Sequence, residues 1–237
     1  MLIMSSETIP EQTSTTIYTV RERNFRLTPV RDIGEFLNSL RIQMYERIIV
    51  KLAPGNYIWE QKVTLPEAST LKIEGEGFIN GGTENKVTVT MSRKDTFEYE
   101  GKKYAVNSRL CIGRDATADI CGINIKEVIC DTREKTPQSS NRGVFNLSGE
   151  NARLFLYQGE FEFSTSPLVN VAGWVFGRII FGHSHFRRVG GEKQPPIQIV
   201  SVETGWNFGS SRAIVSTTHT HVGPGCALGG DNVELHK

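Results

Sequence analysis

The segment Ile48–Gly77, IIVKLAPGNYIWEQKVTLPEASTLKIEGEG, decides the fold. Short apolar runs occur at Ile48–Leu52, Lys62–Leu65 and Leu71–Gly75, and Pro, Gly, Asn and Ser separate them. Runs of this length and composition, bounded by turn residues, predict short strands joined by tight turns. No helix-length segment lies between the runs, so a sheet with helical crossovers is not expected.

The residues upstream of this segment predict an amphipathic helix at Thr28–Met44. Thr28 offers a capping hydroxyl, and Pro29 suits the first helical position. The apolar residues recur at three- and four-residue spacing and are Ile33, Phe36, Leu37, Leu40 and Met44. Residues 1–27 are expected to be a flexible arm, because the first part of this segment is rich in Ser, Thr, Glu and Gln.

An internal repeat is visible in the second half of the chain. The similar segments are Arg153–Leu156, Arg178–Phe181 and Arg212–Val215, together with Val144–Gly149 and Leu168–Gly173. The first shift is 24 to 25 residues, and the second is longer because a predicted loop at Gly190–Pro196 intervenes. A period in the twenties indicates a β-solenoid, in which each coil buries its apolar face against its neighbours.

These features resemble the pectin-lyase-like family of right-handed parallel β-helices. The matching parts, in order, are Thr28–Met44, Leu52–Tyr57, Val63–Pro66 and Leu71–Gly77. The resemblance implies an all-β, single-stranded right-handed parallel β-helix with an N-terminal capping helix at 28–44. Coils would follow over 48–222 and a C-terminal tail over 223–237.

A β-sandwich such as a viral jelly roll is the alternative fold. It would require mostly antiparallel hairpins, and the pattern predicts one only at Thr96–Asn107. The β-helix fold carries lyases, hydrolases, esterases and non-catalytic viral spikes, so the fold by itself sets no activity.

Charge and composition exclude several classes of partner. The 237 residues carry 27 Lys and Arg against 26 Asp and Glu, so neither nucleic acid nor an anionic membrane is indicated. No apolar run approaches the ~20 residues that span a bilayer, and Met1–Met4 does not resemble a signal peptide. We therefore expect a protein that is cytosolic at synthesis and could be virion-associated.

The cysteines are expected to be free thiols rather than zinc ligands, and they are Cys111, Cys121, Cys130 and Cys226.

Paired histidines are the candidate metal ligands. The pairs are His183 with His185 and His219 with His221, and alternate residues of a strand face the same side. If the repeat register holds, the pairs occupy the same place in neighbouring coils and could bind a transition metal or act in acid–base chemistry. A solvent-facing row of histidines without a ligand is the alternative, and no cofactor is otherwise expected.

Catalytic residues are harder to find. Pectate lyases and polygalacturonases of the resembled family use clustered carboxylates, and this chain has no Asp-Asp and no Asn-x-Asp. Asp131, Glu160 and Glu162 are weak candidates for a carboxylate pair, the arrangement that glycoside cleavage requires. The candidate sugar-stacking residues are Tyr99, Tyr157, Trp174 and Trp206. Trp59 is expected in the core.

The sequence favours a non-catalytic structural or receptor- and glycan-binding protein, such as a component of a phage or virus tail spike or surface appendage. Viral β-helices commonly trimerise, so we expect a homotrimer that contacts a surface glycan and reaches other virion proteins through its N-terminal arm. The alternative is a polysaccharide lyase or glycoside hydrolase that acts on an acidic polysaccharide.

Overall fold

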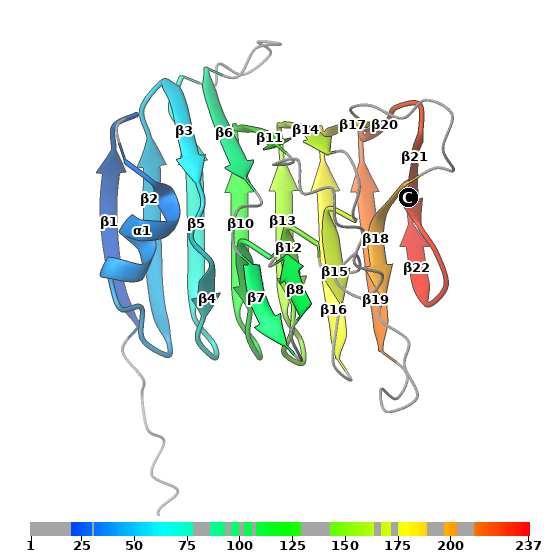
Figure 1. The fold of residues 1–237 in the computed structure, drawn as a ribbon, viewed down its shortest axis with the longest axis horizontal. Coiled ribbons are helices and arrows are strands. Elements are labelled where there is room, and N and C mark those ends of the chain that lie inside the picture. The colour runs from blue at the N-terminus through cyan, green and yellow to red at the C-terminus, as the bar shows by residue number, and fades with distance from the viewer. Residues whose placement is uncertain are drawn as a thin grey trace, which may run out of the picture.

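The chain winds into stacked coils whose strands form three parallel sheets along one axis (Figure 1). The computed structural model describes residues 20–29, 31–77, 86–92, 96–99, 102–105, 108–128, 143–163, 167–171, 175–188, 197–202 and 211–237. Within these residues, no helix is long and apolar enough to cross a membrane.

Each complete coil contributes one strand to each sheet, and β1 and β22 extend sheet A at its two ends. Sheet A contains β1 (Arg21–Leu27), β2 (Glu46–Leu52), β5 (Thr70–Gly75), β10 (Thr117–Cys121), β13 (Arg153–Tyr157), β16 (Phe176–Gly182), β19 (Arg212–Thr218) and β22 (Val233–His236). Sheet B contains β3 (Gly55–Trp59), β6 (Val87–Ser92), β11 (Asn124–Val128), β14 (Glu160–Phe163), β17 (His185–Arg188) and β20 (His221–Val222). Sheet C contains β4 (Val63–Leu65), β9 (Leu110–Ile112), β12 (Phe145–Leu147), β15 (Val169–Val171), β18 (Ile197–Val202) and β21 (Cys226–Gly229).

This arrangement is the expected right-handed parallel β-helix and not a jelly roll. Neighbouring strands in the three sheets pair in parallel, as β13 does with β16 and β12 with β15. The one antiparallel pair among the described strands is the expected hairpin of β7 (Thr96–Tyr99) and β8 (Lys102–Ala105). The chain therefore folds by parallel pairing between successive coils and not by the antiparallel hairpins that a jelly roll requires.

Inward-facing side chains stack in rows to form the core. One row in sheet A runs through consecutive coils and is fully buried; it consists of Ile48, Leu71, Ala118, Leu154, Ile179 and Val215. Because successive strand residues point to opposite faces, the residues between them face outward and remain available for function.

The predicted repeat is confirmed between β13 and β16, but the register between β16 and β19 differs from the prediction by two residues. Arg153 pairs with Arg178, and Phe145–Leu147 pairs with Val169–Val171, as the sequence predicts. The expected match of Arg178 with Arg212 is wrong, because Arg178 pairs with Ile214. A shift of two residues keeps every side chain on its own face of the sheet, so the hydrophobic pattern cannot detect it.

Helix α1 (Ile33–Ser39) covers the first coil but is shorter than the expected Thr28–Met44. Asp32, not Thr28, caps it: its Oδ1 accepts hydrogen bonds from the backbone N–H of Gly34 at 2.7 Å and of Glu35 at 3.2 Å. The chain leaves the helix at Leu40, before Arg41 adopts a φ of 48°. In Figure 1 the helix lies at the blue end of the solenoid, where Ile33 and Leu37 are buried.

The expected arm over residues 1–27 also needs correction. Arg21–Leu27 forms β1, which pairs in parallel with the whole of β2 and so extends sheet A by one strand. Residues 1–19 of the expected arm lie outside the described residues. Strand formation here follows from the edge of β2, whose backbone groups β1 satisfies.

The corner between sheets A and B is a stack of identical turns. Gly122, Gln158, His183 and His219 all have a positive φ, between 49° and 67°, and occupy this corner in successive coils. Backbone hydrogen bonds join the turns, from Gln158 N–H to Gly182 O at 2.9 Å and from His183 N–H to Thr218 O at 2.9 Å. This stack holds the outer faces of the two sheets at a fixed angle beside each other.

Candidate functional site

The candidate functional residues lie on two adjoining outer surfaces that meet at the corner between sheets A and B. They are aromatic rings, imidazoles and charged side chains. The aromatic face lies on sheet A and consists of Lys72, Glu74, Asp119, Phe155, Tyr157 and Ile180. The histidine face lies on the corner and on sheet B and consists of Glu160, Glu162, His183, His185, His219 and His221. Seven of the residues that the sequence nominated thus come together on three neighbouring coils.

Tyr157 forms a flat platform at the centre of the aromatic face. Its register partner is Gly182, and a Cβ at Gly182 would lie only 2.4 Å from the Tyr157 Cδ1 atom, so the ring lies across the glycine. Phe155, two residues earlier, stacks beside it with ring centroids 6.2 Å apart and planes 17° apart. Both rings are half-buried, which leaves part of each accessible. A flat, partly exposed aromatic pair suits stacking on planar or ring-shaped ligands.

Titratable groups adjoin this platform. Asp119 pairs in register with Phe155 on one side and Lys72 on the other. Burial raises the pKa of the Asp119 carboxyl, with Lys72 opposing the shift and Glu74 adding to it. Burial, followed by the charge of Asp119, also raises the pKa of the Tyr157 phenol. Perturbed groups that share a surface mark a candidate functional site.

Glu74 is the second carboxylate of this surface. It forms an ion pair with Lys72, Oε2 to Nζ 3.4 Å, and pairs in register with Cys121. Burial raises the pKa of the Cys121 thiol to about 11, so this sulfur stays protonated at neutral pH and is a poor nucleophile. Asp119 pairs in register with Lys72, so Glu74 lies two residues further along the neighbouring strand on the same face. The usual strand spacing and rise per residue then place the Cα atoms of Asp119 and Glu74 about 8 Å apart.

Asp119, Lys72 and Glu74 were missed by the sequence interpretation. Asp119 alternates with buried Ala118 and Ile120, a signal that places it on an outer face. The signal could not place it beside Tyr157, because that neighbour follows only from the pairing of β10 with β13.

The histidines form two cross-coil pairs, as the repeat register predicts. His183 and His219 stack with ring centroids 4.7 Å apart and planes 10° apart. His185 and His221 are register partners, with centroids 5.5 Å apart and planes tilted by 44°. One detail differs from expectation, because His183 and His219 lie in the corner turn rather than on a strand.

Two hydroxyls, one buried and one half-buried, fix the direction of these imidazoles. The Ser184 Oγ atom lies 3.0 Å from Leu156 O and 3.1 Å from Gly182 O, and its hydroxyl can donate a hydrogen bond to either carbonyl. The Ser184 side chain therefore points inward. His183 and His185, on either side of it, are consequently exposed. Thr220 has the same place in the next coil, with Oγ1 3.2 Å from Phe181 O.

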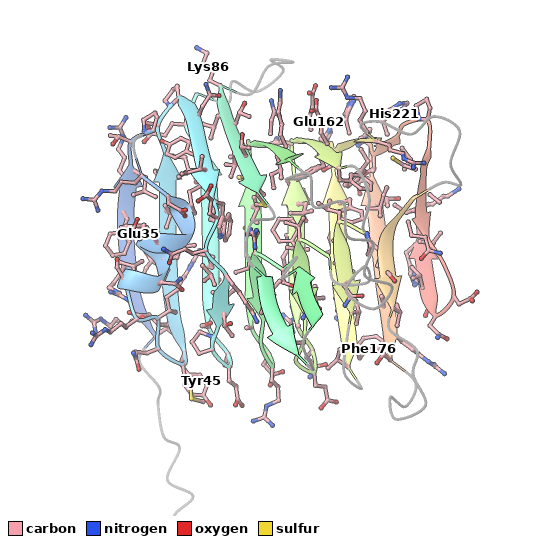
Figure 2. All side chains as sticks on the ribbon, in the orientation of Figure 1. Glu35, Tyr45, Lys86, Glu162, Phe176 and His221 are labelled. Atoms are coloured by element: carbon pink, nitrogen blue, oxygen red, sulfur yellow. The ribbon has the colours of Figure 1, made fainter. Side chains whose placement is uncertain are left out.

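The two glutamates of β14 differ in their surroundings. Glu162 forms an ion pair with Arg187 and is only 14% exposed. Glu160 is exposed and pairs in register with His185. Figure 2 shows Glu162 and His221 along the same edge of the molecule, well away from Phe176. Glu162 therefore has a structural partner, whereas Glu160 lies in the row that contains His185 and His221.

The remaining candidates divide into described and undescribed residues. Asp131, Trp174 and Trp206 lie outside the described residues, as does the side chain of Tyr99, whose backbone belongs to β7. Trp59 is in the core as expected, and its Nε1–H donates to Gln61 O at 3.0 Å. Cys111, Cys121 and Cys226 are free, as expected, and Cys130 is not described. In the described part of the chain, no group of three or more His, Cys, Asp or Glu residues converges on a metal position.

The outer face of sheet C carries a polar row, but it is buried. Asn170 Nδ2–H donates to Asn146 Oδ1 at 3.1 Å, and Asn146 Nδ2 lies 4.0 Å from Cys111 Sγ. These three side chains are at most 9% exposed. A buried ladder of mutually bonded amides stabilises the stacking of coils and offers no open binding surface.

No protein-family model matches the chain, and no curated protein matches its sequence. Among solved structures, it is similar to a pectin methylesterase from Aspergillus niger, with a TM-score of 0.40 and 13% identity over 97% of this chain and 73% of the other. It is also similar to a pectin methylesterase from carrot, with a TM-score of 0.32 and 9% identity over 87% of this chain and 65% of the other.

Proposed function

We propose that this protein is a carbohydrate-binding β-helix that holds an acidic polysaccharide against its aromatic face. The observation that carries the proposal is the Tyr157 ring, which lies flat across Gly182 with Phe155 stacked beside it. Sugar rings present a flat face of C–H groups, and aromatic rings in this orientation stack on such a face.

Charge beside the platform supports an acidic ligand. Arg153 and Arg178 are register partners, both exposed, and each lies two residues before a member of the aromatic face. Neighbouring guanidinium groups bind carboxylates with paired hydrogen bonds, as the uronic acids of an acidic chain would require. Because the coils repeat along the axis, successive sugar units could follow the same face from strand to strand.

The test is binding to a panel of soluble acidic and neutral polysaccharides, pectin among them, by affinity electrophoresis and calorimetry. The protein should bind at least one acidic member, and Tyr157→Ala should weaken that binding by roughly 10-fold, equivalent to about 1.4 kcal/mol. Tyr45→Ala is the matched control, because Tyr45 is 43% exposed and lies just before β2, which is three strands away from β13 in sheet A. Equal loss in both variants, or no binding by the wild type, would count against the proposal.

A second candidate function is cleavage of the bound polysaccharide. The observation in its favour is the pair of Asp119, a carboxyl with a raised pKa, and Glu74, a carboxylate held by Lys72. Strand register places the two residues on one face with Cα atoms about 8 Å apart, so both carboxyl groups can reach one bound glycosidic bond, as glycoside cleavage requires. A carboxyl with a raised pKa is the group that such chemistry uses as the acid.

Cleavage is tested separately from binding. New reducing ends would indicate hydrolysis, and ultraviolet absorbance from new double bonds would indicate elimination. Asp119→Asn and Glu74→Gln should each abolish product formation without abolishing polysaccharide binding, because the Tyr157 and Phe155 rings that stack on the sugar remain in place. Binding without any product would leave the carbohydrate-binding proposal standing and remove the catalytic one.

A further inference from the structure

We propose that His185 and His221 together form a binding site for one divalent transition-metal ion, with Cu²⁺ bound most tightly. The two residues are register partners on β17 and β20, and both are exposed on the outer face of sheet B. The site is separate from the aromatic face, so it does not depend on the proposed carbohydrate function.

The separation of the two rings fits a shared ion. Imidazole nitrogens coordinate such metals at about 2.0 Å, and two of them at a tetrahedral angle place their ring centroids roughly 5 Å apart. The His185 and His221 centroids are 5.5 Å apart, close to this value, and the planes are tilted by 44° rather than stacked in parallel. Small side-chain rotations therefore suffice to complete the geometry.

The corner pair does not meet the same requirement. His183 and His219 stack with their planes only 10° apart and centroids 4.7 Å apart. In parallel stacked rings the nitrogen lone pairs lie in two parallel planes and do not converge on one ion. His183 and His219 therefore serve as a matched control, because they are also histidines and each lies two residues before a member of the proposed site.

The backbone holds the site in place before any ion arrives. His221 N–H donates to Ser184 O at 2.8 Å, which ties the two strands together directly beside the histidines. The inward anchoring of Ser184 and Thr220 keeps both imidazoles on the outside. A preorganised pair loses little conformational freedom on binding, which favours affinity.

The donor set determines the class of metal. Imidazole suits copper, nickel and zinc, whereas calcium and magnesium prefer oxygen ligands, and affinity for divalent ions of this series peaks at copper. Glu160 pairs in register with His185 on the side away from His221, and the described residues contain no third converging ligand. Water would complete the coordination, so we expect an exchangeable ion with micromolar affinity rather than a permanent structural metal.

The experiment uses the full chain without an affinity tag, freed of metal with a chelator. Titration with CuCl₂ followed by calorimetry should show one saturable site per chain, and electron paramagnetic resonance should show coupling to two nitrogens. His221→Ala and His185→Ala should each weaken binding by roughly 100-fold, because a single imidazole loses the advantage of a linked second ligand. NiCl₂ and ZnCl₂ should bind at the same site more weakly than copper.

Two controls make the result decisive. The double variant His183→Ala/His219→Ala and the variant His236→Ala should bind copper within about threefold of the wild type, which is well under 1 kcal/mol. Absence of a saturable site in the wild type would overturn the proposal. Copper binding that survives His221→Ala, or that is lost with His183 and His219 instead, would also overturn it. Circular dichroism of each variant checks that the β-helix remains folded.

Discussion

At the scale of single residues, Asp119 shows how the fold changes the chemistry of a side chain. It alternates with buried Ala118 and Ile120, yet half-burial among Lys72, Glu74 and Tyr157 gives its carboxyl a raised pKa. Burial is the main cause, because removing a carboxylate from water disfavours its charged form. The folded protein therefore binds the Asp119 proton more tightly than the unfolded chain does.

This difference predicts how stability depends on pH. The folded-state pKa lies above the unfolded value of about 3.9, so stability falls as pH rises from that value through the folded pKa. Asp119→Asn has no such proton to lose, so its free energy of unfolding should rise relative to that of the wild type over that interval and keep a constant difference above it. Urea unfolding at several pH values measures this. The exposed Glu150→Gln variant is the control, and a pH-independent difference between Asp119→Asn and the wild type would contradict the explanation.

At the scale of elements, α1 depends on close contact with the coil it covers. A Cβ on Gly34 would lie 2.4 Å from Gln61 O and 2.9 Å from the Trp59 Cδ1 atom, and neither the backbone oxygen nor the fully buried indole has room to move. Glycine at this position is therefore a packing requirement, even though alanine is the better helix former.

We predict that Gly34→Ala destabilises the protein by about 1–3 kcal/mol through overpacking. Chemical denaturation measures the free energy of unfolding. Glu35→Ala, the next residue of the same helix, is exposed and should change stability by no more than about 0.5 kcal/mol. Equal effects of the two substitutions would show that α1 does not pack against Trp59 as described.

Buried charge also stabilises this first coil. Glu46 is 2% exposed, and Arg23 Nε lies 2.6 Å from its Oε1 while Gln43 N–H donates to its Oε2 at 2.9 Å. Burial alone would raise the pKa of the Glu46 carboxyl, but the hydrogen bonds from Arg23 and Gln43 and the charges of Arg23 and Arg21 outweigh it and lower the pKa. The interaction joins β1 to β2, which explains why Arg21–Leu27 is a strand rather than part of an arm.

At the scale of the whole molecule, both ends of the solenoid keep apolar side chains that are only partly buried. At the first coil, α1 and β1 leave Met44 and Ile58 exposed. The last coils leave a further group partly exposed, which consists of Val222, Cys226, Leu228, Val233 and Leu235. Leu235 faces the core side of sheet A, as the register partner of Val215, but is 47% exposed. An uncovered core is a surface that association can bury.

The homotrimer that the sequence predicts can be tested on this basis. Light scattering should give three times the 26.5 kDa mass of the chain, and Leu235→Asp should lower the measured mass if the last coil contributes to the contact. Ser216→Asp, on the outer face of the neighbouring strand β19, is the control. A monomeric mass for the wild type at micromolar concentration would contradict the prediction.

The sequence by itself determined the architecture, because short β-branched runs, Pro and Gly turns and a period in the twenties are local signals that only stacked coils satisfy together. It also placed His183, His185, His219 and His221 in neighbouring coils, since the repeat carries that information. Only the tertiary structure decided that Asp119 lies beside Tyr157 and that β19 is shifted by two residues, because the number of residues between paired strands varies from coil to coil. Side-by-side contacts between coils are set by strand register, and register is a property of the pairing rather than of either strand alone.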